Sequence, residues 1–324
     1  MALLALAEGG LRLTVPLSWL QLDHEREDGF LVFIDADNGY RFHDAFFARP
    51  DFDKVRGGLR YRTNSVGFRE TREIPRRRPA GTYRILAIGD SWVYGLAQSQ
   101  GQTMADHLER LLPSRLGVAR VEVINAGVPG SSAFDMLRRW RSLAENYEVD
   151  GVLLSTSHNL NRQQKTLAAR QRWYASTRGA PYVDLRLYLA LRRLLVPLTR
   201  GAGARPGQRP GDSDVRDMQA LVTDVHGRGL KVWMMLAPSW HEREELAKPE
   251  LNAVNSTYVK TLGPLGVRFG GHALRQRACY GSHDKTHPGP AGARVMAVVM
   301  AEIIASGASR PVQVERPRCA AVKK

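Results

Sequence analysis

After residue 81 the chain alternates short apolar runs with longer stretches of helical periodicity. The apolar runs are YRILAIGD, VEVINAG, DGVLLSTS and KVWMMLAP, and the stretches between them include MADHLERLL and AFDMLRRWRSLAENY. Strands that are apolar at every position are buried on both faces, as they are in a parallel sheet covered by helices on both sides. The alternation therefore predicts an α/β fold with a doubly wound core.

The first 80 residues have a different texture. They mix aromatic and β-branched residues with turn formers such as Asp37-Asn38-Gly39, a mixture typical of short strands joined by tight turns. The run RRRPAG, from Arg76 to Gly81, is typical of a linker. The predicted domains are a small β-rich lead segment over residues 1–80, a larger α/β domain over 81–308 and a polar, basic tail over 309–324.

A segment of low apolar content interrupts the larger domain. The run TRGAGARPGQRPGDSD, over residues 199–214, is rich in Gly, Pro and Arg and has almost no apolar side chain to anchor it. Such a composition predicts a mobile surface loop.

The chain is strongly basic. Its 47 Lys and Arg residues against 32 Asp and Glu residues give a formal charge of +15. A positive field concentrates anionic substrates, lipid surfaces or nucleic acids, and the charge alone does not choose among them. The arginines are spread along the whole chain, without zinc-finger spacing or an aromatic RNA-binding motif. Nucleic acid is therefore a disfavoured partner.

The two cysteines, Cys279 and Cys319, are too few for a disulfide scaffold or a zinc site. In an exported protein they would form one bridge between the tail and the region before residue 284. In a reducing compartment both would be free thiols. The sequence leaves the two alternatives open.

The chain begins with a short apolar run from Ala2 to Ala7. This run is far shorter than the roughly 20 residues of a membrane span, and no basic segment precedes it as in a signal peptide. It is interpreted either as an ordinary first helix or as the remnant of a longer membrane anchor. Association with a membrane is expected only in the second case.

Polar or small residues follow the predicted strands, at the sheet edge where ligands of open parallel sheets bind. Ser91 in Gly89-Asp90-Ser91 would suit a nucleophile that opens a helix, although an N-cap is the simpler explanation of such a serine taken alone. After the next strand, Gly127 or Gly130 would expose a backbone N–H to an oxyanion. Taken alone, a plain turn explains these glycines more simply.

Two further groups lie later in the chain. Asn159, or its neighbour Asn161, would donate a side-chain hydrogen bond to an oxyanion or cap a helix. Asp284 and His287 are three residues apart, just before the last helical stretch. On a turn, the carboxylate would orient the imidazole while the other ring nitrogen accepts a proton from Ser91.

The order of these groups resembles the SGNH/GDSL hydrolase family. Gly-Asp-Ser, a glycine, an asparagine and Asp-x-x-His occur in that order over roughly residues 83–306. The resemblance implies a flavodoxin-like three-layer α/β/α fold and a reaction that needs no metal or organic cofactor. It assigns Ser91 as nucleophile, His287 as general base, Asp284 as its orienter, and the Ser91 N–H, Gly130 in preference to Gly127, and Asn159 as oxyanion donors.

The chain departs from the family's usual sequence at a few positions. The third block is usually Gly-x-Asn-Asp, where this chain has Ser157 and Leu160 in place of the Gly and the Asp. Asn159 is kept, so the oxyanion role is expected to be retained. Trp92 follows the nucleophile where a smaller aliphatic residue is commonest, and it would either bind substrate or serve packing only.

The lead segment is similar to that of bacterial family members. The run Asn64-Ser65-Val66-Gly67-Phe68-Arg69 is similar to a stretch often found ahead of their catalytic domain, and Glu8-Gly9-Gly10-Leu11-Arg12 to the end of an N-terminal membrane helix. The resemblance favours an extracytoplasmic protein, periplasmic or secreted and tethered in a longer form, over a cytoplasmic one.

Together these features predict a serine esterase that forms an acyl-enzyme and removes a short O-acyl group, acetyl above all, from a carbohydrate or a related hydroxylated metabolite. An O-acyltransferase would use the same residues with an alcohol in place of water. The third alternative is a polysaccharide- or nucleic-acid-binding protein that keeps the same scaffold but has lost the catalytic activity. The sequence does not indicate the oligomeric state.

Overall fold

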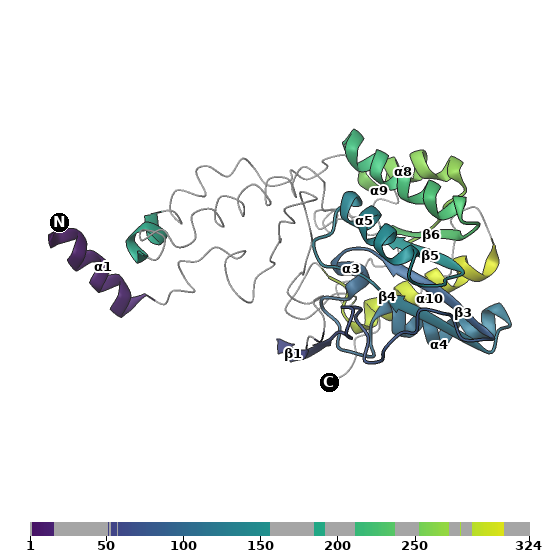
Figure 1. Ribbon diagram of the computed structural model, residues 1–324, viewed down its shortest axis with the longest axis horizontal. Coiled ribbons are helices and arrows are strands. Elements are labelled where there is room, and N and C mark those ends of the chain that lie inside the picture. The colour runs from purple at the N-terminus through teal and green to yellow at the C-terminus, as the bar shows by residue number, and fades with distance from the viewer. Residues whose placement is uncertain are drawn as a thin grey trace. The chain divides into compact units, whose positions relative to one another are not determined.

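The chain forms two compact units, one from residues 1–46 and 163–205 and the other from residues 47–162 and 206–324. The computed structural model describes residues 2–15, 51, 53–56, 58–155, 185–191, 211–236, 253–271, 279 and 287–307 (Figure 1). The α/β domain predicted over residues 81–308 lies in the second unit, except for residues 163–205, which belong to the first.

The described part of the first unit consists of helix α1 (Ala2–Thr14) and a short helix over residues 186–191. Glu8 joins the two helices, because its carboxylate accepts hydrogen bonds from the N–H groups of Leu187 (2.8 Å) and Arg186 (2.9 Å). These bonds lower the pKa of Glu8. Arg12 donates to the same carboxylate at 2.7 Å. None of the described helices is long and apolar enough to cross a membrane.

The core of the second unit is a five-stranded parallel sheet with the strand order β4-β3-β5-β6-β7. Its strands are β3 (Thr82–Ile88), β4 (Arg120–Asn125), β5 (Gly151–Ser155), β6 (Lys231–Leu236) and β7 (Arg268–Gly271). Every residue of β5 is buried, and so are all residues of β3 except Tyr83. The structure thus confirms the predicted sheet of apolar strands buried on both faces.

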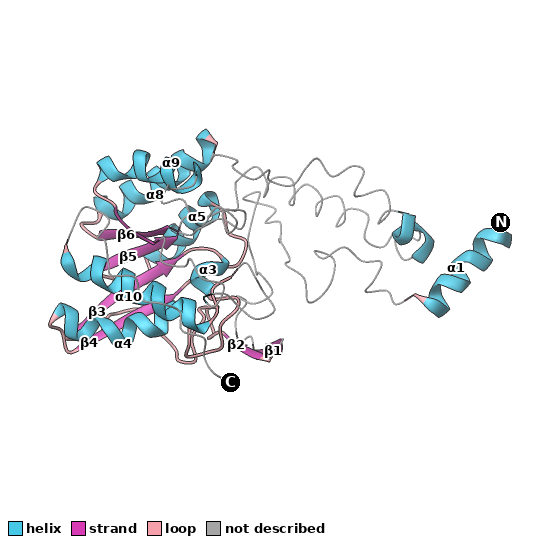
Figure 2. Cartoon of the chain, turned by 180° about the vertical axis from the view of Figure 1, so that it is seen from behind, coloured by secondary structure: helices cyan, strands magenta, loops and turns pink. Residues whose placement is uncertain are grey.

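Helices cover both faces of this sheet, as Figures 1 and 2 show. One layer contains α5 (Ala133–Ala144), α8 (Asp212–Gly227) and α9 (Ala253–Leu262), and the other contains α4 (Met104–Leu116) and α10 (Pro290–Ser306). Leu86 and Ile88 of β3 belong to the apolar cluster under the first layer. Ile85 and Ala87 belong to the cluster under the second. The predicted three-layer α/β/α fold is confirmed.

Helix α8 begins inside the segment that was predicted to be a loop over residues 199–214. Its first residue is Asp212, and the carboxylate of Asp214 accepts a hydrogen bond from the Gly211 N–H at 3.0 Å. This acceptor near the helix N-terminus fixes the start of the helix. The end of the predicted loop is therefore corrected to residue 211, and residues 199–210 lie outside the described residues.

The two short strands of the lead segment, β1 (Asp53–Arg56) and β2 (Leu59–Arg62), form an antiparallel pair. A 3-10 helix over Gly263–Leu265 connects α9 to the region of β7. The expected turn at Asp37-Asn38-Gly39 lies outside the described residues.

The domain boundary expected at residue 80 is not where the two units separate, because residues 47–80 belong to the same unit as the sheet. Phe68 is fully buried and its ring lies 5.2 Å from that of Tyr147 in an edge-on arrangement. Arg84 of β3 is also fully buried and donates to the carbonyl of Pro75 at 3.0 Å. Its ion pair with Glu122 measures 2.8 Å. Core packing and a buried arginine thus attach the lead segment to the sheet.

Candidate active site

Ser91 is the first residue of the four-residue helix α3 (Ser91–Tyr94), directly after β3. The turn between them is tight, because a Cβ atom at Gly89 would lie 2.4 Å from the hydroxyl of Ser155 and 2.4 Å from a methyl group of Val93. Only glycine fits such a position without displacing a neighbour. The turn places Ser91 at the carboxyl end of the sheet, the edge where open parallel sheets bind ligands.

His287 lies close to this serine in space, although it is near the other end of the domain in sequence. The ring nitrogen Nε2 of His287 lies 2.8 Å from the Oγ atom of Ser91, although the two residues are 196 positions apart. Ser91 is 9% exposed and His287 is half-buried. The pair has the distance and the atoms that a transfer of the hydroxyl proton to the imidazole requires.

Asp90 is a third ionisable residue at this site, and sequence reasoning gave it no role. It is 2% exposed, and its carboxylate accepts a hydrogen bond from the Trp92 N–H at 3.0 Å. Burial raises the pKa of Asp90 to about 6, while the Trp92 hydrogen bond and the nearby His287 act in the opposite direction. The buried carboxylate is therefore within electrostatic range of the imidazole.

The two glycines considered as oxyanion donors differ in their surroundings. The N–H of Gly127 donates to the side chain of Asn125 at 3.2 Å, so it is already used. Gly130 has a positive φ of 86° in a turn closed by a hydrogen bond from Ser131 to Val128 (3.1 Å). A further hydrogen bond links Val128 N–H to the carbonyl of Gly89 at 2.9 Å, beside the nucleophile turn. The preference for Gly130 as oxyanion donor stays a prediction of the family resemblance.

The remaining residues of the expected site lie outside the described part of the chain. They are Asn159, its alternative Asn161, and Asp284. Their roles stay predictions of the family resemblance. Among the described residues, no group of His, Cys, Asp and Glu could hold a metal ion.

Comparison with known families identifies the chain. The model of the GDSL-like lipase/acylhydrolase family matches residues 87–295, more than half of the chain, and the match includes both Ser91 and His287. The chain belongs to this family. As a GDSL-like hydrolase it acts on carboxylic esters, and the resemblance seen in the sequence is confirmed.

Solved structures of esterases are similar to this GDSL-like hydrolase at low identity. A psychrotrophic esterase, EstA, from Pseudoalteromonas sp. is 15% identical with a TM-score of 0.43, over 69% of this chain and 97% of that one. A two-domain esterase active on acetylated mannans is 15% identical with a TM-score of 0.47, over 74% and 53%. A protein described as a member of the lipolytic G-D-S-L family, from Desulfitobacterium hafniense DCB-2, is 14% identical with a TM-score of 0.41, over 68% and 98%. No curated protein matches the sequence.

Trp92 was expected either to bind substrate or to serve packing only. Its side chain is 4% exposed and belongs to the apolar cluster between the sheet and the layer of α4 and α10. These contacts support packing, and a role in substrate binding stays a prediction.

Cys279 packs beside the segment that carries His287. Its carbonyl accepts a hydrogen bond from Gly289 at 2.9 Å, and a Cβ atom at Gly292 would lie 2.1 Å from the same oxygen. Cys279 is disulfide-bonded, and Cys319 is the one other cysteine of the sequence. Of the two states that the sequence allowed for Cys279, the structure has the bonded one.

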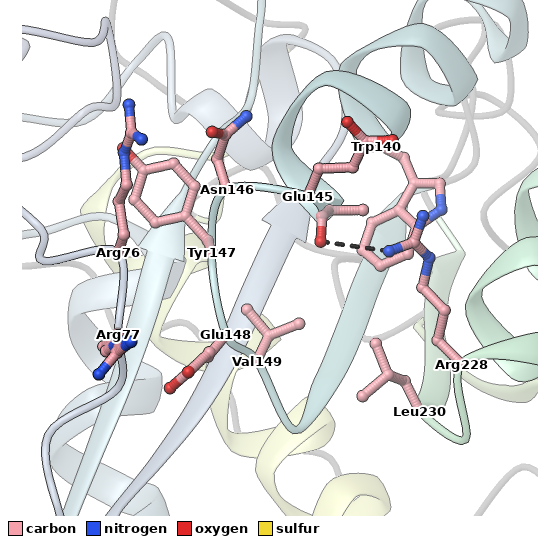
Figure 3. A pocket seen from close by; sticks show the side chains of 11 residues that line it. Arg76, Arg77, Trp140, Glu145, Asn146, Tyr147, Glu148, Val149, Arg228 and Leu230 are labelled. Carbon is pink, nitrogen blue, oxygen red and sulfur yellow. Dashed lines mark hydrogen bonds between the residues drawn. The ribbon is translucent and has the colours of Figure 1, made fainter.

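A pocket of about 430 Å³ lies at the opposite end of the sheet, beside Val149 before β5 and Leu230 before β6 (Figure 3). The guanidinium of Arg228 lies 5.5 Å from the ring centroid of Trp140 and donates to the carbonyl of Ala144 at 3.3 Å. The pocket is therefore separate from the Ser91 site, which is at the carboxyl ends of the strands.

Proposed function

We propose that this hydrolase is a serine esterase in which Ser91 is the nucleophile and His287 is the general base. The observation that supports the proposal is the 2.8 Å contact between Ser91 Oγ and His287 Nε2. A family member with these two groups in contact at the carboxyl end of a parallel sheet has the central pair of a serine hydrolase.

The proposed reaction has two stages. Ser91 Oγ forms a bond to the acyl carbon while its proton moves to His287, and the imidazolium then returns the proton to the departing alcohol. Water next attacks the acyl-enzyme, gives its proton to His287 and releases the carboxylic acid with a free Ser91 hydroxyl. The proposed oxyanion donors are the N–H of Ser91, the N–H of Gly130 and the side chain of Asn159.

Two carboxylates have proposed roles around His287. Asp284 orients the imidazole, as the Asp-x-x-His spacing and the family resemblance indicate. Asp90 adds a negative charge that stabilises the imidazolium as it forms, a role supported by the burial of Asp90 and by the effect of His287 in lowering the pKa of this carboxyl.

The proposed substrate carries a short acyl group, acetyl above all, on a carbohydrate or a related hydroxylated metabolite. Both the short acyl group and the alcohol rest on the family resemblance.

The substrate proposal is tested with a series of nitrophenyl esters from acetyl to octanoyl, together with an acetylated oligosaccharide. We expect kcat/KM to be highest for acetyl, and acetate to be released from the oligosaccharide. A maximum at octanoyl would contradict the short acyl group. Acetylated acceptor appearing faster than free acetate, when a sugar is added, would show an O-acyltransferase instead.

We further propose that the protein works outside the cytoplasm. The disulfide-bonded Cys279 supports this location, since disulfides persist in oxidising compartments. Alkylation of intact cells with a thiol reagent tests it. The expected result is a protein that reacts only after reduction, and immediate alkylation of both cysteines would contradict the proposal.

A further inference from the structure

The lead segment ends in a tight turn that brings Arg69 to the sheet edge. Asn64 forms this turn, since its side chain accepts a hydrogen bond from the Phe68 N–H at 3.0 Å. Gly67 supplies a positive φ of 78° within it. Directly after the turn, the Arg69 N–H donates to the carbonyl of Asn125 at 2.9 Å, at the end of β4.

The side chain of Arg69 is 1% exposed and holds the segment that follows the nucleophile helix. Its guanidinium donates to the carbonyls of Tyr94 (3.0 Å) and Gly95 (2.6 Å), and also to that of Gln98. The guanidinium carbon lies 4.6 Å from the ring centroids of Tyr61 and of Tyr94. The planar guanidinium can donate to several carbonyls and contact two aromatic faces at the same time, whereas the ammonium group of a lysine cannot.

Two of these carbonyls, those of Tyr94 and Gly95, lie at the end of the helix that Ser91 begins. The carbonyl of Ser91 accepts hydrogen bonds from the N–H groups of Gly95 (3.0 Å) and Leu96 (3.1 Å). Arg69 therefore holds the carboxyl end of α3, while the Gly89 turn holds its amino end. The position of the nucleophile depends on both ends, because α3 is a single turn.

Gln98 connects this segment to the residue next to His287. Its side chain is fully buried, and its Nε2 donates to the carbonyl of Pro288 at 2.9 Å across 190 residues of sequence. Residues 94–98 are thus hydrogen-bonded to both chain segments that carry the reacting pair.

We propose that Arg69 and Gln98 are positioning residues that set the distance between Ser91 and His287. This inference rests on the proposed function of that pair. Arg69 fixes segment 94–98 on the lead segment, and Gln98 fixes the His287 segment on 94–98. Proton transfer depends steeply on the distance between donor and acceptor, so the lead segment is part of the active-site structure and not only a connection to the domain.

The test compares Gln98→Met with Gln102→Met, using hydrolysis of nitrophenyl acetate. Methionine keeps the size of glutamine but removes the donor to Pro288. Gln102 is the control, because it is the same residue type four positions further along the chain and its side chain is exposed. We expect Gln98→Met to lower kcat about 10- to 100-fold with KM changed less than about twofold, and Gln102→Met to retain wild-type values.

A fall in kcat with a nearly unchanged KM distinguishes a positioning role from a general loss of structure. Thermal unfolding checks that each variant is folded at the assay temperature. A folded Gln98→Met with wild-type kcat would overturn the inference. Should this variant not fold, Arg69→Lys replaces it, with an expected loss of about tenfold in kcat. Wild-type kcat in a folded Arg69→Lys would overturn the inference equally.

Ser91→Ala separates this inference from the proposed function. If Ser91→Ala is inactive while Gln98→Met has the wild-type kcat, only the positioning role fails. If Ser91→Ala retains activity, the proposed function itself fails.

Discussion

Asp90 lies between the glycine and the serine of the nucleophile turn, and its protonation state changes within the range where an esterase is assayed. Burial raises its pKa to about 6, so the carboxyl is ionised at pH 8 and neutral at pH 5. Its negative charge reaches the imidazolium of His287 only in the ionised form. The activity of the enzyme should therefore depend on Asp90 at alkaline pH and not at acidic pH.

We predict that Asp90→Asn lowers kcat/KM about tenfold at pH 8, which corresponds to roughly 1.4 kcal/mol of lost transition-state stabilisation. Asparagine keeps the shape and an oxygen that accepts the Trp92 hydrogen bond, while the negative charge is removed. Rates from pH 5 to 9 should show the difference shrinking toward pH 5, where the wild-type carboxyl is protonated. Equal rates at pH 8 would contradict the role of the charge.

Single residues were predictable where a motif gives them a role. Ser91 and His287 followed from the family resemblance, and the structure places them in contact. Asp90 was missed because the importance of a carboxyl depends on its burial, which the sequence Gly-Asp-Ser does not show. The sequence does not show that the Gly127 N–H is bonded to Asn125, and the preference for Gly130 as oxyanion donor stays a prediction.

The turn from β3 into α3 leaves no room for a side chain at Gly89, so we expect any substitution there to be harmful. Gly89→Ala should destabilise the protein by about 1–3 kcal/mol through overpacking and lower kcat by displacing the Ser91 turn. Urea unfolding and ester hydrolysis measure the two effects.

The control for this variant is Gly227→Ala, at the last residue of α8, where an added Cβ meets no atom within 4 Å. It should leave both stability and kcat near wild type. A Gly89→Ala protein as stable as Gly227→Ala would show that the Gly89 turn has more room than the structure indicates.

Whole elements were predictable where burial leaves a pattern in the sequence. The strands β3 and β5 are nearly continuous apolar runs because both of their faces are covered. The start of α8 was missed, since the capping carboxylate of Asp214 lies in a run rich in Gly, Pro and Arg. Arg69 ends the run from Asn64 that resembles the family's lead segment, but the sequence does not show that its side chain is buried and bonded to the residues after α3.

The folded molecule buries several carboxyl groups, and these make its stability depend on pH. Burial, and then the charge of Glu109, raise the pKa of Glu70 to about 8. Burial also raises the pKa of Asp135 to about 7. A carboxyl with a raised pKa binds its proton more tightly when folded, so its contribution is full below the unfolded pKa and is lost as pH rises through the folded value.

We predict that Glu70→Gln gains about 4 kcal/mol in free energy of unfolding relative to wild type between pH 4.5 and pH 9. Glutamine stays neutral and its oxygen can still accept the hydrogen bond from the Asn125 N–H, which measures 3.2 Å in the wild type. Urea unfolding of both proteins at several pH values measures the difference. Glu73→Gln, at an exposed site, should not show such a gain, and parallel pH profiles for wild type and Glu70→Gln would contradict the prediction.

For the whole molecule, the sequence predicted the three layers but not the division into units. Residues 1–46 share a compact unit with residues 163–205, and Glu8 caps a helix 178 residues away. Contacts over such distances in sequence leave no periodic or compositional trace. The domain boundary at residue 80 was predicted wrongly for the same reason. Residues 47–80 belong with the sheet through the packing of Phe68 and the hydrogen bonds of Arg84, which are contacts between residues distant in sequence.

The central claim is that Ser91 and His287 perform the reaction, and kcat/KM for nitrophenyl acetate in Ser91→Ala and His287→Ala tests it most directly. Both variants should be folded, as judged by thermal unfolding, and each should lose about 10³-fold or more of the wild-type value. A folded variant of either kind that hydrolyses the ester at the wild-type rate would contradict the account.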